Sequence, residues 1–301
     1  MEVSGAGPTP SEYIRKHLVH LTNEKQKDIV DFSVIQYDSI IVSFLLGCVV
    51  CFVLWRAARG ATAGVPGRFQ AFVEMMVEMV DNQAKSLIHN DTSRKLIAPM
   101  ALMVFCWIFL LNFMDLIPVD LLPFLWKYGI PFVHDHTDAG LYAVLGSEPY
   151  MRVVPTASLS VTLGLSLGVL LLCLFYNIKI KGFGGWAHEL VTAPFGTSRN
   201  PLFAIPLGVV NFSMQMIEFV AKTVSHGMRL FGNLFAGELV FMLIALLGGY
   251  AALSLGGGLL FVGHVIAGTV WAIFHILVIT LQAFIFMMLA LIYLGQAHDA
   301  H

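Results

Sequence analysis

The sequence has little charge for its length. Only 12% of its 301 residues are Asp, Glu, Lys or Arg, whereas 57% are hydrophobic. This composition excludes a soluble globular domain and is typical of a polytopic membrane protein. The formal net charge of −2 provides no basic surface for nucleic acid. A Gly-x-x-x-x-Gly-Lys-Ser/Thr motif is absent from the sequence, so no P-loop for a nucleotide is expected.

Cysteine is also scarce, and its positions argue against chemistry. The four cysteines all lie in apolar stretches: Cys48, Cys51, Cys106 and Cys173. The first two have C-x-x-C spacing, but there is no second pair, so neither a redox centre nor a metal site is expected. Four His and Asp residues at 134–138 fit no metal-ligand spacing and indicate a solvated loop. We therefore expect no metal and no cofactor.

The N-terminal region has no apolar run that could serve as a signal peptide. We expect residues 1–36 to form a polar tail and residues 37–301 to form a single membrane domain. No internal repeat is visible, which argues against the inverted-repeat plan of many secondary transporters.

The hydrophobic runs predict an all-α polytopic membrane protein with about five transmembrane helices. The expected spans are 37–58, 96–117, 157–178, 206–248 and 259–295. A helix over 206–248 would be roughly 60 Å long, twice the hydrocarbon thickness, and must tilt or project. Residues 68–89 alternate apolar and charged faces and predict an amphipathic surface helix. Glycine- and proline-rich residues at 182–205 and 248–258 predict loops.

Lys and Arg are concentrated in two of the connections, 56–95 and 179–205. Positive connections face the cytoplasm. With five crossings, this places the N-terminus outside the membrane and the C-terminus in the cytoplasm.

The segment 206–248 carries a polar stripe centred on Arg229. At 100° per residue, the following residues fall within roughly 60° of it: Asn211, Gln215, Glu218, Lys222, Ser225, His226 and Asn233. An arginine at membrane depth is costly and cannot lose its charge, so it predicts function. Packing between helices is the alternative explanation, and it suits Asn or Ser better than Arg.

The last span carries its own polar face. His275 and Gln282 are seven residues apart, and His264, eleven residues before His275, falls on nearly the same face. Glu238 points away from Arg229, at about 180°. In a hairpin of the last two helices, Glu238 and His275 should lie at similar depth. We therefore predict that these two titratable side chains pair.

Two long motifs carry a family resemblance. The run RLFGNLFAGE at 229–238, followed by WAIFHILVITLQAFIF at 271–286, resembles subunit a of the F-type ATP synthase. The resemblance extends through GVPGRFQ (64–70), KLIAPMAL (95–102), NFMDLIPVDLLP (112–123) and RVVPTASLSVTLGLSLGV (152–169). It covers nearly everything after residue 30.

The resemblance implies a non-catalytic, proton-conducting stator subunit of the F0 sector. Arg229 would face the carboxylate of a c-ring and separate two offset half-channels, which couples proton flow to rotation and ATP synthesis. The path from outside would use Asn233, Glu238, His275 and Gln282, with Ser158, Ser160, Asp115 and Asp120 as possible inlet lining. The exit would use Ser225, Lys222, Glu218 and Gln215.

The implied partners are a c-ring, a b-type peripheral stalk, the remaining F0F1 complex and the lipid bilayer of a bacterial inner membrane. The expected ion is H⁺ rather than Na⁺. Two positions depart from the family pattern. Many relatives have glutamate where this chain has Gln215, and Glu218 stands one turn later. Relatives often have Asp and Asn where this chain has Ser158 and Ser160.

Two other functions stay open at this point. A stand-alone transporter or channel could use Arg229 to bind an anionic substrate. A structural scaffold could use the polar stripe only to bind a partner helix.

Overall fold

The computed structural model describes residues 34–117, 154–196, 201–249 and 255–296, with the isolated positions Ile14, Thr22 and Leu121. Its long elements are α2 (Tyr37–Arg59), α3 (Arg68–Leu87), α4 (Asp91–Phe113), α8 (Leu159–Thr192), α9 (Pro201–Gly249) and α10 (Leu255–Gln296). Two 3-10 turns, Met114–Leu116 and Pro155–Ala157, flank the gap after α4. This part of the chain contains no β-strand element. Asp120 and the His and Asp residues at 134–138 lie outside the described residues.

Five of these helices are long and apolar enough to cross a membrane: Tyr37–Arg59, Asp91–Leu116, Leu159–Thr192, Leu202–Gly248 and Gly257–Gln296. This confirms the all-α polytopic class. The helix α3 is not among them, and it buries Val80 and Ala84 while its charged side chains remain accessible. The prediction of one amphipathic helix beside five spans is therefore confirmed.

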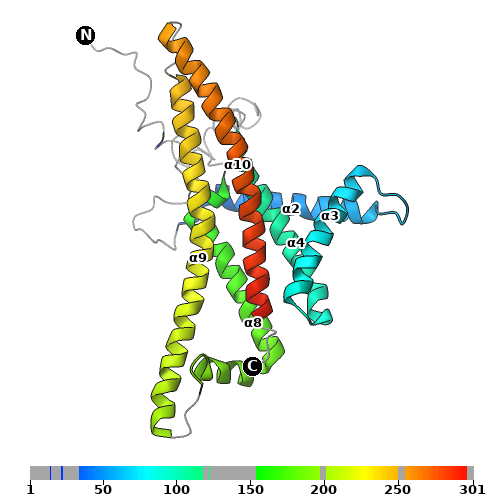
Figure 1. Cartoon of the computed structure of the whole chain (residues 1–301), viewed down its shortest axis with the longest axis vertical. Coiled ribbons are helices and arrows are strands. Elements are labelled where there is room, and N and C mark those ends of the chain that lie inside the picture. The colour runs from blue at the N-terminus through cyan, green and yellow to red at the C-terminus, as the bar shows by residue number, and fades with distance from the viewer. Residues whose placement is uncertain are drawn as a thin grey trace, which may run out of the picture. The chain divides into compact units, whose positions relative to one another are not determined.

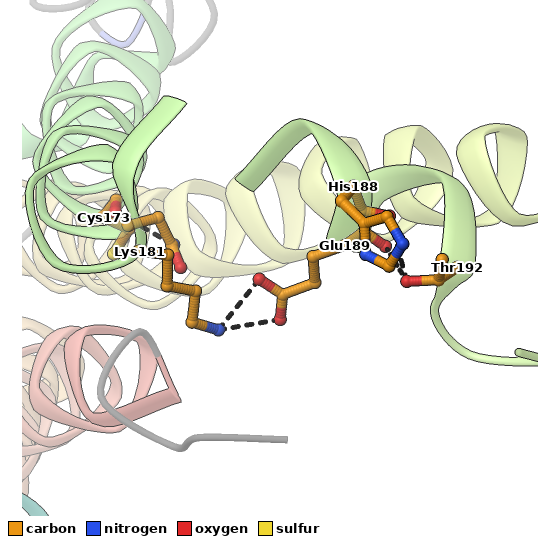
Figure 2. Close-up of polar contacts among 6 residues, drawn as sticks. Cys173, Lys181, His188, Glu189 and Thr192 are labelled. Atoms are coloured by element: carbon orange, nitrogen blue, oxygen red, sulfur yellow. Dashed lines mark hydrogen bonds and ion pairs between the residues drawn. The ribbon is translucent and has the colours of Figure 1, made fainter. Parts of the chain in front are cut away.

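The loop predicted over 182–205 was wrong for much of its length, because α8 resumes after a kink and runs to Thr192. The kink is at Gly182, whose φ of 70° and ψ of 162° form a conformation open essentially to glycine alone. Lys181, just before the kink, places its Nζ 2.8 Å from both carboxylate oxygens of Glu189 beyond it (Figure 2). The Thr192 hydroxyl donates to the His188 carbonyl. Glycine content alone did not reveal these stabilising contacts.

The side chain of Asn211, on the predicted polar stripe, holds the end of α8. Its amide nitrogen donates to the carbonyls of Val191, Thr192 and Gly196 at 2.8–3.1 Å. Its amide oxygen accepts from the Phe195 backbone N–H at 3.2 Å. Asn211 is fully buried, so its role is structural.

The helices α9 and α10 both begin earlier than predicted. α9 starts at Pro201, a residue well suited to the first helical position, and includes Pro206. α10 starts at Leu255 and includes the glycines 256–258 that were expected to form a turn. In an apolar environment, backbone groups favour helical hydrogen bonds because no water competes for them. This preference outweighs the weak helix propensity of glycine.

The chain forms two compact units, which are described one at a time. Unit 1 comprises Met1–Cys51, Trp107–Ser158 and Gly232–Gln282. Within it α9 packs antiparallel to α10 (Figure 1). Gly248 lies against the His264 ring, whose Nδ1 is 2.6 Å from the Ile244 carbonyl oxygen. On α4, Trp107 donates to the Ser43 carbonyl of α2 at 2.9 Å.

Unit 2 comprises Phe52–Cys106, Leu159–Phe231 and Ala283–His301. Gly227 of α9 packs so closely on α8 that an added Cβ would lie 2.9 Å from Leu163 Cδ2. Gly295 of α10 similarly faces the Leu87 carbonyl of α3. The core of unit 2 is aliphatic: Ile88, Ile97, Leu230, Met287, Leu291 and Leu294 are buried.

Candidate functional site

A buried histidine and a buried aspartate meet in unit 1. His275 Nε2 of α10 lies 2.6 Å from Asp115 Oδ2, and the two side chains are 1% and 3% exposed. Asp115 is placed by the 3-10 turn that closes α4. Two titratable groups at this distance and depth can share or exchange a proton.

The imidazole of His275 is held on its other sides by apolar groups. Its ring lies edge-on to Phe241, with centroids 5.3 Å apart, and stacks on Trp271 at 6.1 Å. It also occupies the space that a side chain at Gly237 would need. Glu238, the next residue, is buried. The predicted pairing of Glu238 with His275 stays a prediction, while the carboxylate that the structure places within hydrogen-bond distance of His275 is that of Asp115.

Further polar groups are buried in the same unit. The amide nitrogen and the amide oxygen of Asn112 have no hydrogen-bond partner within the described residues. The same is true of Thr156 Oγ1 and Trp271 Nε1. Asn112, near the end of α4, precedes Asp115 by three residues. Asn112 and Thr156 are both 0% exposed. Buried polar groups of this kind are usually satisfied by ordered water. The interior of unit 1 is therefore suited to hold water.

Two amide side chains predicted for the entry path, Asn233 of α9 and Gln282 of α10, lie side by side in unit 1. The Asn233 amide donates to the Gln282 amide oxygen of α10 at 2.8 Å. Gln282 is 3% exposed, whereas Asn233 is exposed. A polar group thus connects the surface of α9 to the interior of unit 1.

The two serines predicted as inlet lining have different surroundings. Ser158 is buried, and its hydroxyl donates to the Gln36 amide oxygen at 2.7 Å. Ser160 is exposed. Nearby in sequence to Gln36, Asp38 is 1% exposed and accepts the backbone N–H of Ser39 at 2.7 Å. The buried carboxylate of Asp38 was not predicted as part of the site.

Unit 2 contains a cavity of about 390 Å³ between α8, α9 and α10. Three predicted exit residues line it, Gln215, Glu218 and Lys222, together with the buried His226. The ammonium group of Lys222 lies 2.5 Å from Glu218 and donates to the Gln296 amide oxygen at 2.8 Å. It also lies 5.2 Å from the centre of the Tyr293 ring. The cavity is polar on its α9 side and large enough for several water molecules.

The side chain of Arg229 is on the outside of unit 2. It is exposed, as is Ser225 one turn earlier. Asn233, one turn later on the same face, is exposed as well. A charge exposed on a membrane-length helix is stable only where a partner or water faces it.

The family follows from comparison with known proteins. The model of the family described as ATP synthase A chain matches residues 40–295. The chain belongs to the ATP synthase A chain family. All polar groups of both units from Asn112 to Tyr293 lie within this match, whereas Gln36, Asp38 and Gln296 lie just outside it.

Relatives in the family are similar over their whole length. The chain is 68% identical to "ATP synthase subunit a" of Acidovorax sp. (strain JS42), covering 100% of both chains. It is 67% identical to the protein of the same name from Paracidovorax citrulli, again over 100% of both. The Chromobacterium violaceum protein of that name is 45% identical, over 97% of this chain and 98% of its own.

Sequence reasoning found most, but not all, of the polar groups in this member of the ATP synthase A chain family. It missed Asn112, Thr156 and Asp38 as site residues, and it placed His226 on the stripe without a role. Spacing could have found Asn112, which lies one turn from Asp115 in a span that is otherwise apolar. The burial of Thr156 and Asp38 depends on packing between segments that are distant in sequence.

Proposed function

We propose that this chain is the proton-translocating stator subunit of the F0 sector of a bacterial ATP synthase, without catalytic activity of its own. Full-length relatives named ATP synthase subunit a support this assignment. The sequence has no P-loop for a nucleotide. Its contribution is therefore to conduct protons and couple their flow to the part of the complex that makes ATP.

Arg229 carries the proposal. Its fixed charge is exposed on α9, a helix long and apolar enough to cross a membrane, which suits a partner bearing a carboxylate in the membrane, namely a c-ring. The positive charge favours the ionised form of that acid and so promotes release of its proton. It also repels a proton that would cross without rotation of the ring.

The polar interior of unit 1 is the proposed inlet. Asp115, His275 and Glu238 would receive protons with the help of water held by Asn112 and Thr156. The hydrogen-bonded pair Asn233 and Gln282 would deliver them to the exposed face of α9. Ser158 and Asp120 are proposed inlet lining, and Ser160, being exposed, is proposed to face lipid or a partner.

The cavity of unit 2 is the proposed exit. Glu218 and Lys222 line it as a titratable pair, and Gln215 stands where relatives often have an acid. Ser225, exposed one turn before Arg229, is proposed to hydrate the exit near the ring. The acid at Glu218 thus takes the place of the one missing at position 215.

We assign the chain to a bacterial inner membrane, with the N-terminus in the periplasm and the C-terminus in the cytoplasm. The Lys and Arg residues of the connections at 56–95 and 179–205 support this orientation. The proposed partners are the c-ring, the subunit b peripheral stalk and the remaining F0F1 complex.

The test is ATP-driven proton pumping in inverted membrane vesicles that contain the complete complex. We expect Arg229→Ala to abolish pumping while the complex stays assembled and hydrolyses ATP. The matched control is Met228→Ala, because Met228 is an exposed, uncharged neighbour on the same helix; it should pump normally. Normal pumping by an intact Arg229→Ala complex would refute the proposal. A stand-alone transporter, which would show flux from the isolated chain, has no support from the comparisons.

A further inference from the structure

His226 is a buried titratable side chain without a polar partner. It is 2% exposed, and within the described residues neither ring nitrogen has a hydrogen-bond partner. Leaving a buried polar group unpaired costs about 1–3 kcal/mol. A side chain retained at such a cost requires an explanation beyond filling space.

Packing alone does not supply that explanation. The ring lies edge-on to Phe286, with centroids 3.9 Å apart, and 6.0 Å from the ring of Tyr293. These aromatic contacts hold the imidazole in place but leave both nitrogens unsatisfied. An apolar side chain would make the same contacts without that penalty.

The position of His226 on α9 completes a ladder of titratable groups along the unit 2 cavity. Glu218, Lys222 and His226 are four residues apart, so they occupy successive turns of one face, about 6 Å apart along the axis. The side chains of Glu218 and Lys222 are 49% and 26% exposed, and His226 is 2% exposed. The ladder thus runs from solvent to the interior, and Arg229 is three residues beyond its inner end.

The unit 2 cavity connects these three groups, because its lining includes His226, Glu218 and Lys222. Water in the cavity could satisfy the ring nitrogens of His226 and link them to the Lys222 and Glu218 pair. A neutral imidazole has one ring nitrogen that donates and one that accepts a hydrogen bond, which suits it to pass a proton on.

We propose that His226 is the innermost proton carrier of the exit, an inference that rests on the proposed function. One ring nitrogen accepts the proton released from the c-ring carboxylic acid, which becomes a carboxylate. The other nitrogen gives a proton to water in the cavity, and exchange between the tautomers returns the ring to its starting form. The titratable and charged groups around this step are Glu218, Lys222 and Arg229 on α9, Tyr293 on α10, and Cys173 and Glu189 on α8.

The experiment measures ATP-driven pumping by the complete complex in inverted vesicles for His226→Gln, His226→Phe and His226→Ala. Glutamine keeps hydrogen bonding without titration, and phenylalanine keeps an aromatic ring. We expect both to slow pumping at least about tenfold, because positioned acid-base groups typically contribute 10²–10⁴-fold. Added imidazole should accelerate His226→Ala, since the cavity can admit a small ring, and should leave wild type unchanged.

Native gels and ATP hydrolysis establish that each variant complex is intact. Wild-type pumping by His226→Gln or His226→Phe would overturn the inference. A slow His226→Ala complex that imidazole does not accelerate would also overturn it and assign His226 to packing. The Arg229→Ala complex, measured alongside, separates the two proposals, because pumping by that variant refutes the proposed function itself.

Discussion

Gly237 lets the His275 imidazole reach Asp115, so Gly237→Ala should disrupt the buried pair of unit 1. An added Cβ at this position would overlap the imidazole, lying 2.9 Å from Nδ1 and 3.1 Å from Nε2. Gly237 lies within the helix α9 and His275 within the helix α10. The backbone is therefore stiff, and the imidazole must rotate away from Asp115.

The magnitude follows from two opposing effects. Glycine to alanine within a helix is stabilising by about 1 kcal/mol. Separating His275 from Asp115, now 2.6 Å apart and almost fully buried, costs roughly 3 kcal/mol because a buried polar group loses its partner. The net destabilisation is about 2 kcal/mol, and proton pumping should fall because the inlet loses its paired acid and base.

The matched control is Gly268→Ala on α10 of the same unit. There an added Cβ would lie 3.6 Å from Ile244 Cγ2, an ordinary contact, so this variant should be as stable as wild type or more so. Stability is measured as the temperature at which the chain leaves the purified complex in detergent, and function as ATP-driven pumping. The double variant Gly237→Ala with His275→Ala should regain packing but not pumping. Equal stability and pumping in Gly237→Ala and Gly268→Ala would refute the reasoning.

Two further predictions concern α8 and the amide pair. Gly182→Ala should destabilise the chain by about 1–3 kcal/mol, because a residue with a Cβ is strained at φ of 70° and ψ of 162°. The control is Gly184→Ala, where an added Cβ meets open space. Equal dissociation temperatures for the two variants would contradict the expectation. A double-mutant cycle of Asn233→Leu and Gln282→Leu should give a coupling of about 1 kcal/mol from their 2.8 Å hydrogen bond; additive losses of stability would show that the two amides act independently.

The spans were predictable from the sequence because their signal is local. A helix in an apolar environment satisfies its own backbone, so length and hydropathy suffice to find it. The boundaries were less predictable. The residues after Gly182 were expected to form a loop because they are rich in glycine and proline. They are helical because the Lys181–Glu189 ion pair and Asn211 of α9 stabilise them, and these contacts join residues that are apart in the sequence.

Much of the candidate site was also predictable, and for a related reason. Helical periodicity placed Gln215, Glu218 and Lys222 on one face, and the structure finds all three lining one cavity. The same periodicity gave no means of separating the exposed Arg229 from the buried His226. That distinction depends on which faces of α9 the neighbouring helices cover.

The sequence by itself determined the membrane class, the five spans, the family and the position of the arginine, because composition and periodicity along one helix are properties of neighbouring residues. Only the tertiary structure decided that His275 contacts Asp115, that Asn112 and Thr156 are buried with polar atoms that find no partner among the described residues, and that Asn211 is structural. Those facts depend on distances between helices far apart in the chain. Such distances are set by close packing of particular small and large side chains, as Gly237 against His275 shows.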